Sequence, residues 1–154
     1  DEESKVFEVL LDLPYITKKL ISELPNNLKL ETLLIVDDNK INRKVLGRIG
    51  EQFGYQVFFA ENGLSGVKHF IKIKPDIVFM DIQMPVMDGL QSTELIRKYE
   101  LKNHLERSCI LGITAHGTHL YEDKCKAAGM DFMVNKPVKK DQIQDAIISM
   151  TTNR

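Results

Sequence analysis

Five short apolar segments, each followed by a longer stretch of helical periodicity, recur along this chain between residues 32 and 150. The segments have the length of β-strands and lack a clean apolar–polar alternation, which is typical of strands buried on both faces. We predict strands at 32–36, 55–59, 77–80, 110–113 and 132–134. Because parallel strands need crossover connections, five such units indicate an α/β fold, a doubly wound parallel sheet with helices on both faces.

The stretches between the strands carry apolar residues at helical spacing. In the first stretch these residues recur every four positions and should form one buried helix face: Ile41, Val45, Ile49 and Phe53. Gly54 follows where a helix commonly ends. Gly47 and Gly50 are poor helix formers, so we expect them to permit close packing of this helix. Four further helices are predicted around 64–71, 95–99, 120–128 and 143–150.

Composition argues against nucleic acid and membrane as partners and favours a reducing cell compartment. The formal net charge of −1 gives no electrostatic reason to expect nucleic acid as a partner. No apolar run approaches the ~20 residues that span a bilayer, so we expect no membrane insertion by this segment. The two cysteines, Cys109 and Cys125, do not make a disulfide framework, which favours a reduced, cytoplasmic location.

Polar residues collect where four of the predicted strands end. Asp37 and Asp38 follow the first strand, Asp81 the third, Thr114 the fourth and Lys136 the fifth. In a parallel α/β sheet the functional side chains gather at this edge, and neighbouring strands lie only ~5 Å apart. We therefore expect three carboxylates, a hydroxyl and an ammonium group to converge on one crevice.

Three carboxylates in one crevice repel one another unless a cation lies among them, and Mg²⁺ prefers such oxygen ligands. With Mg²⁺ and Lys136 supplying positive charge, the cluster could bind a phosphoryl group. Asp81 is then the natural nucleophile, because its strand lies between the acidic pair and the Thr114 and Lys136 side. Each residue alone has an ordinary alternative role, such as a helix N-cap for Asp38 or a solvated charge for Lys136. Their order at successive strand ends makes those roles a poor explanation of the whole set.

Residues 32–150 resemble the receiver domain of two-component signalling. The resemblance is carried by four motifs: Leu-Leu-Ile-Val-Asp-Asp-Asn at 33–39, Met-Asp-Ile-Gln-Met-Pro-Val-Met-Asp-Gly at 80–89, Ile-Thr-Ala at 113–115 and Lys-Pro at 136–137. It implies a flavodoxin-like (βα)5 sheet with strand order 2-1-3-4-5. It also implies phosphorylation of Asp81, with Mg²⁺ held directly by Asp38, Asp81 and the backbone carbonyl of Gln83, and by Asp37 largely through water.

The resemblance further implies that Thr114, Ala115 and Lys136 bind the phosphoryl group. The donor would be a phosphohistidine on a histidine kinase or a histidine phosphotransfer domain. Asn39 followed by Asn42-Arg43 is similar to receivers attached to hybrid sensor histidine kinases. Such a domain would catalyse its own phosphorylation and dephosphorylation, and the parent chain would be a kinase. The sequence leaves open a stand-alone response regulator as the parent, and a homodimer as the assembly.

One position departs from the family. Receivers usually carry Tyr or Phe three residues before the lysine, as a ring that turns inward on phosphorylation, and this chain has Met133 there. Phe132 should not substitute, because successive strand residues point to opposite faces. We expect the surface of the 120–128 helix and the fifth strand to respond to phosphorylation, since that helix is the least apolar of the five.

The segment 1–28 precedes the predicted receiver domain, 29–154. Its Leu13-Pro14 step and the residues after it align with Lys136-Pro137 and the residues after that. Two explanations stay open: a linker, or the remnant of a preceding pseudo-receiver in which Leu13 replaces the lysine.

Two rival functions come from other classes. An aspartyl phosphatase of the haloacid-dehalogenase type also uses Asp, Thr and Lys around Mg²⁺, but it needs Asp-x-Asp after its first strand, and position 39 is Asn. A flavin-binding module needs a phosphate loop at that place, where Asp37 and Asp38 would repel a phosphate.

Overall fold

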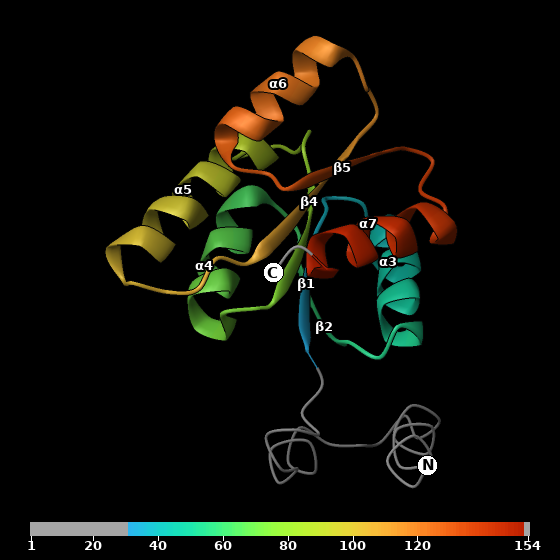
Figure 1. Cartoon of the computed structure of the whole chain (residues 1–154), viewed down its shortest axis with the longest axis horizontal. Helices are drawn as coiled ribbons and strands as arrows, with labels where there is room; N and C mark the ends of the chain where they lie inside the picture. Colours follow the sequence, from blue (N-terminus) through green and yellow to red (C-terminus); the bar gives the residue numbers. More distant parts are fainter. Residues whose placement is uncertain (1–30, 153–154) are drawn as a thin grey trace, which may run out of the picture.

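Five parallel strands form one sheet in the order β2-β1-β3-β4-β5 in the computed structural model, which describes residues 31–152 (Figure 1). The elements are β1 (Thr32–Val36), α3 (Lys40–Gln52), β2 (Gln56–Ala60), α4 (Gly63–Ile73), β3 (Ile77–Asp81), α5 (Gly89–Lys102), β4 (Cys109–Thr114), α6 (His119–Ala128), β5 (Phe132–Asn135) and α7 (Lys140–Thr152). The predicted flavodoxin-like order and all ten elements are confirmed. The two explanations of segment 1–28 concern residues outside the described part.

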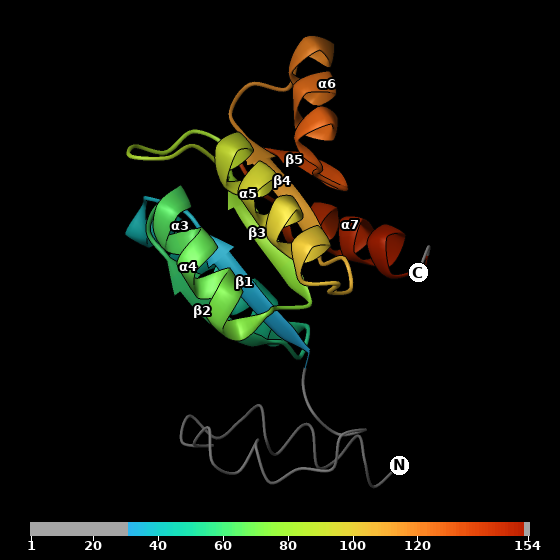
Figure 2. The ribbon, with the colours of Figure 1, turned by 90° about the vertical axis from the view of Figure 1, so that its left-hand side faces the viewer.

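Helices cover both faces of the sheet (Figure 2). The core under α3 and α7 contains Leu33 and Ile35 of β1, whereas the core under α4, α5 and α6 contains Leu34 and Val36. All four side chains have no exposed surface. The strand is therefore apolar at every position because successive side chains enter two different cores.

The buried face of α3 differs from the prediction. Ile49 is buried, but Ile41 is 72% exposed and Val45 is 48% exposed. Gly47 and Gly50 occupy the buried face, where a Cβ would lie 2.6 Å from the Phe59 ring and 2.5 Å from a Leu33 methyl group, respectively. The glycines thus let the helix approach the sheet closely, as predicted, and that approach turns the first two apolar positions outward.

Helix ends are fixed more firmly at some elements than at others. The Asn39 side chain accepts hydrogen bonds from the backbone N–H groups of Ile41 and Asn42. Helix α3 therefore begins at Lys40, two residues after Asp38. Helix α6 ends at Gly129, whose positive φ suits glycine, but Thr118 provides no side-chain cap at its start. The start of α6 is therefore held less tightly than its end.

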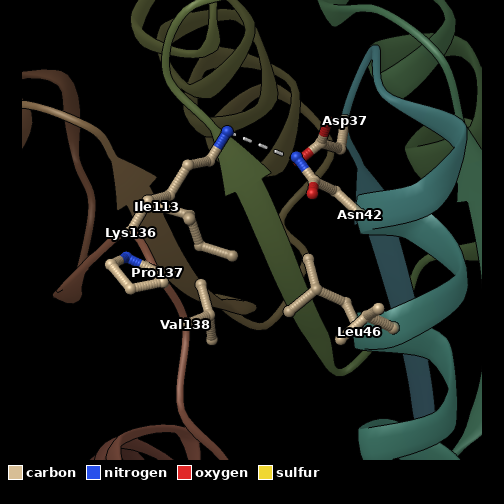
Figure 3. Close-up of a pocket in the computed structure, with 8 residues that line it drawn as sticks. Asp37, Asn42, Leu46, Ile113, Lys136, Pro137 and Val138 are labelled. Carbon is tan, nitrogen blue, oxygen red and sulfur yellow. Dashed lines mark ion pairs between the residues drawn. The ribbon is translucent and has the colours of Figure 1, made fainter.

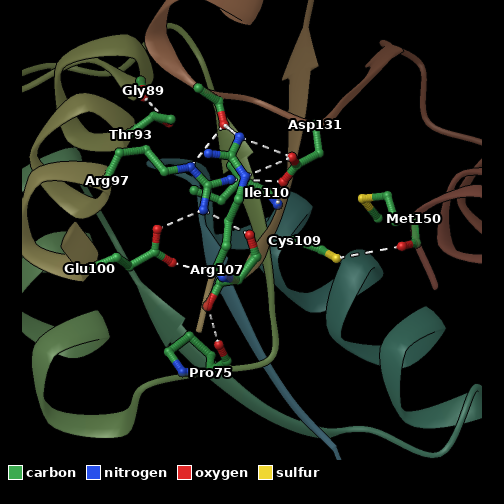
Figure 4. A network of polar contacts seen from close by, with 12 residues as sticks. Pro75, Gly89, Thr93, Arg97, Glu100, Arg107, Cys109, Ile110, Asp131 and Met150 are labelled. Carbon is green, nitrogen blue, oxygen red and sulfur yellow. Dashed lines mark hydrogen bonds and ion pairs between the residues drawn. The ribbon is translucent and has the colours of Figure 1, made fainter. Parts of the chain in front are cut away.

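A polar network holds the other end of α6, at the edge of the sheet where β4 begins (Figure 4). Arg97 of α5 donates to the Gly129 carbonyl (2.9 Å), the Ser108 carbonyl (2.8 Å) and the carboxylates of Glu100 (2.8 Å) and Asp131 (2.7 Å). Asp131 in turn accepts from the backbone N–H of Ile110 at 2.8 Å. One guanidinium group therefore joins α5, the start of β4 and the turn between α6 and β5.

The two cysteines cannot pair with each other in this fold. Cys109 lies in the core under α3 and α7, and Cys125 lies in the core on the opposite face of the sheet. Within residues 31–152, none of the helices combines the length and the apolar character needed to cross a membrane.

Candidate functional site

Strand register brings the predicted site residues to one edge of the sheet. Val36 pairs with Met80, so Asp37, the residue after β1, lies beside Asp81 at the end of β3. Asp81 pairs with Ile113, the residue before Thr114, and Thr114 pairs with Asn135, the residue before Lys136. The carboxyl ends of four strands thus place these side chains around one crevice, as the sequence predicts.

The three carboxylates form a cluster that fits a divalent cation. One carboxylate oxygen from each of Asp37, Asp38 and Asp81 lies within 4.8 Å of the others. Asp37 is 1% exposed and Asp81 is 3% exposed. Among the residues that the structure describes, none donates a hydrogen bond to Asp37 Oδ2 or Asp81 Oδ2. Buried anionic oxygens without donors are costly, and Mg²⁺ takes just such ligands.

The Lys136 ammonium group places a positive charge next to the buried carboxylates. Its Nζ lies 3.3 Å from Asp81 Oδ1. It also lies 3.8 Å from Asp37 Oδ2, and this second ion pair is marked in Figure 3. The backbone N–H of Lys136 also bonds to the Thr114 carbonyl at 2.7 Å, which continues the pairing of β4 with β5. The ammonium group therefore lies close to both buried carboxylates.

Burial and like charge shift both buried carboxyl groups. Burial, followed by the neighbouring Asp37 charge, raises the pKa of Asp81 from 3.8 to about 6, although Lys136 acts in the opposite direction. Burial also raises the pKa of Asp37, against the effect of the Asn39 N–H that donates to it at 2.8 Å. Each ionised group is thus less stable here than in water, and a cation bound between them would relieve this cost.

The remaining predicted residues lie at the same edge but are not all turned to the cluster. The Thr114 hydroxyl accepts from the His116 N–H at 3.0 Å, within its own loop. Ala115 is exposed beside it, and Gln83 is exposed in the loop two residues after Asp81. The role of the Gln83 carbonyl as a metal ligand stays a prediction.

The position that lacks the usual aromatic ring faces α6. Met133 is partly buried against the core under α4, α5 and α6, whereas its neighbour Phe132 is 39% exposed. This alternation agrees with the prediction that Phe132 does not replace the missing ring. Met133 pairs with Gly112, where a Cβ would lie 2.5 Å from Met130 Sδ. Two methionines therefore fill this part of the α6 interface.

Sequence reasoning assigned no contact in the site to two residues that lie near it. Tyr121 of α6 packs against the same core as Met133, and its side chain interacts with that of Gln83. Burial is the main cause that raises the pKa of Tyr121. Arg43 donates from Nη1 to the Asp37 carbonyl at 2.8 Å. The spacing from Asn39 pointed to Arg43 only through resemblance, and no local signal pointed to Tyr121, because its role depends on how α6 lies over the β3–α5 loop.

Comparison with known proteins agrees with this geometry. Residues 33–148 match the family model of the response regulator receiver domain. The chain is 39% identical over 115 residues to hybrid signal transduction histidine kinase A of Dictyostelium discoideum, a match that covers 74% of this chain and 5% of that kinase. The chain therefore spans a small part of such a relative.

Two solved structures share the fold at moderate sequence identity. The receiver domain of a sensor histidine kinase from Pseudomonas aeruginosa, with a magnesium ion in its active-site cleft, has a TM-score of 0.67 and 29% identity over 75% of this chain and 93% of that one. A Saccharomyces cerevisiae response-regulator receiver domain, in complex with a histidine phosphotransfer protein, has a TM-score of 0.70 and 26% identity over 75% of this chain and 84% of that one.

Proposed function

This chain belongs to the response-regulator receiver family, and from that premise we propose that Asp81 accepts its phosphoryl group in the presence of Mg²⁺. A receiver domain is the phosphoacceptor module of a two-component phosphorelay. The observation that carries the assignment is the pair of buried carboxylate oxygens without hydrogen-bond donors, on Asp37 and Asp81, next to the Lys136 ammonium group.

The metal ligands we propose are Asp38 and Asp81 directly, with the Gln83 carbonyl, and Asp37 through water. Their support is the clustering of the three carboxylates and the magnesium ion named for the Pseudomonas receiver domain. When bound, Mg²⁺ would supply positive charge that offsets the negative charge of the transferred group.

In the transfer step, an Asp81 carboxylate oxygen attacks the phosphorus of a phosphohistidine. The P–O bond to Asp81 forms as the P–N bond breaks, and the imidazole nitrogen keeps the electron pair of that bond. Lys136 is fixed on one side of Asp81 and can contact a phosphoryl oxygen. The Thr114 hydroxyl, now bonded within its own loop, would turn to donate to a second phosphoryl oxygen. That turn would move the β4–α6 loop and the loosely capped start of α6.

The donor we propose is a histidine kinase or a histidine phosphotransfer domain, by analogy with the yeast complex. The parent we propose is a hybrid sensor histidine kinase, because of the similarity to Dictyostelium kinase A, with a stand-alone regulator as the alternative. A cytoplasmic location agrees with two buried thiols on opposite faces of the sheet.

The test is labelling by acetyl phosphate with Mg²⁺, followed by intact-mass measurement. Wild type should gain one phosphoryl group, and Asp81→Asn should gain none, because the amide is not a nucleophile. Asp123→Asn, at an exposed position on α6, is the matched control and should label like wild type. Labelling that persists in Asp81→Asn would show that another residue is the acceptor.

The haloacid-dehalogenase alternative finds no support at position 39. That enzyme class needs a second carboxylate there as an acid and base, but Asn39 is neutral and its side-chain oxygen caps α3.

A further inference from the structure

Tyr121 lies where α6 meets the loop between β3 and α5. It is in the first turn of α6, and its partly buried ring packs against the core under α4, α5 and α6. Met84, from the β3–α5 loop, belongs to the same core. The Tyr121 side chain also hydrogen-bonds with the side chain of Gln83, two residues after Asp81. Tyr121 thus connects α6 with the loop that carries a proposed metal ligand.

The residues that lead into α6 are exposed. Positions 115–120 all lie at the surface, and Leu120 is 71% exposed. Thr118, the residue before the helix, makes no side-chain cap. Tyr121 is therefore the first residue of α6 that packs against the core, and its contacts fix where the start of the helix lies.

The other end of α6 is anchored. The Gly129 carbonyl accepts from Arg97 Nε and from Arg107 Nη2, each at 2.9 Å. Cys125 and Ala128, in the last turn of the helix, are buried. Because only this end is fixed by the polar network, a displacement of the β4–α6 loop would swing the start of α6 and carry Tyr121 with it.

The core against which Tyr121 packs contains adaptable side chains. Met84 and Met130 are buried in it, and Met133 packs against it. Methionine is unbranched and flexible, so it fills a changed space more readily than a branched or aromatic side chain does. The position that carries a ring in most receivers is Met133 here, so no ring can turn inward from β5. The methionines would instead allow a ring on α6 to shift.

We propose that Tyr121 is the positioning residue that couples phosphorylation of Asp81 to α6, in place of the aromatic ring that this chain lacks at Met133. The inference rests on the proposed function and adds the side chain that transmits it. Without a phosphoryl group, the contact with Gln83 holds the start of α6 over the β3–α5 loop. When the Thr114 hydroxyl turns to the phosphoryl group, the β4–α6 loop moves, and Tyr121 leaves Gln83 and repacks against the methionines. The contact therefore stabilises the unphosphorylated arrangement, and its removal should favour the other one.

The test uses beryllofluoride with Mg²⁺ as the probe that stands for the phosphoryl group. The variants are Tyr121→Phe, Gln83→Ala, which keeps the backbone carbonyl, and the two combined. The matched control is Tyr99→Phe, because Tyr99 is a partly buried tyrosine of the same core but lies in the last turn of α5. Two quantities are measured for each: the affinity for beryllofluoride by titration calorimetry, and amide exchange along α6 with and without the probe.

Tyr121→Phe should bind beryllofluoride about fivefold more tightly than wild type, the change expected from one neutral hydrogen bond that favours the unbound state. Its exchange at residues 118–122 should already be raised without the probe, toward the level that wild type reaches with it. Gln83→Ala should behave in the same way, and the combined variant should add little, because both substitutions remove one contact. Tyr99→Phe should behave like wild type.

Equal affinity and exchange in Tyr121→Phe and wild type would overturn the proposal, as would equal changes in Tyr99→Phe or fully additive effects of the two substitutions. Exchange that rises throughout the core would also overturn it, because that result indicates only a loss of packing. Wild type that neither binds beryllofluoride nor labels with acetyl phosphate would refute the phosphoacceptor role instead. The exchange of Tyr121→Phe without the probe tests the restraint on α6 independently of that role.

Discussion

Replacing Asp81, the proposed phosphoacceptor, should make the metal-free domain more stable. Asp81→Asn keeps the shape of the side chain but removes its negative charge. That charge is buried, because Asp81 is only 3% exposed. The amide oxygen can still accept a hydrogen bond from Lys136, which lies 3.3 Å from the present carboxylate. We expect phosphorylation to be lost and the folded state to become more stable.

The size of this effect follows from the pKa of Asp81, which folding raises from 3.8 to about 6. Above the folded-state pKa both states are ionised, and the native state carries the full cost of the buried charge. At about 1.4 kcal/mol per pKa unit, the cost is roughly 3 kcal/mol near neutral pH. As the pH falls through about 6 the native state takes up a proton first, so the cost declines to about 1 kcal/mol near pH 4.5.

Urea unfolding of wild type and Asp81→Asn in a chelator would measure the difference. We expect the variant to be about 3 kcal/mol more stable near pH 7.5, with a much smaller gain near pH 4.5. Saturating Mg²⁺ should stabilise wild type and close much of the gap, because only wild type keeps the full ligand set. Asp123→Asn, the exposed control, should change the free energy of unfolding by less than about 0.5 kcal/mol. A variant no more stable than wild type near pH 7.5, or a gain that ignores pH, would refute the reasoning.

Three further substitutions test other parts of the structure. Lys136→Met removes the cation that lowers the pKa of Asp81, so this pKa should rise above about 6. NMR of the carboxyl carbon over a pH titration would detect the rise, and an unchanged pKa would contradict the site geometry. Gly50→Ala should destabilise the domain by about 1–3 kcal/mol in urea unfolding, because the new methyl group would lie 2.5 Å from a Leu33 methyl group. An unchanged free energy of unfolding would mean that α3 can move away from the sheet. Arg97→Met should cost about 3–5 kcal/mol, because it leaves the buried Glu100 carboxylate without its cation and leaves Asp131 with Arg107 alone. Amide exchange should rise at the end of α6, and exchange that rises only elsewhere would argue against the anchoring role.

Local sequence patterns determined the elements and the chemistry. Strand and helix positions follow from the spacing of apolar residues along a short stretch, and this spacing located all five strands to within one or two residues at each end. The acidic pair, Asp81, Thr114 and Lys136 could be placed at one edge because, in a parallel sheet, all strands end there.

The tertiary structure decided which way side chains face. Ile41 and Val45 have the spacing of a buried helix face, but they are exposed because two glycines let a different side of α3 approach β1 and β2. The contact of Tyr121 with Gln83, and the bond from Arg97 to Asp131, join residues more than thirty positions apart. Periodicity describes one element at a time, whereas the angle and depth at which two elements pack depend on the side chains of both. The exposed apolar edge of α3 and the anchored end of α6 are therefore visible only in the folded chain.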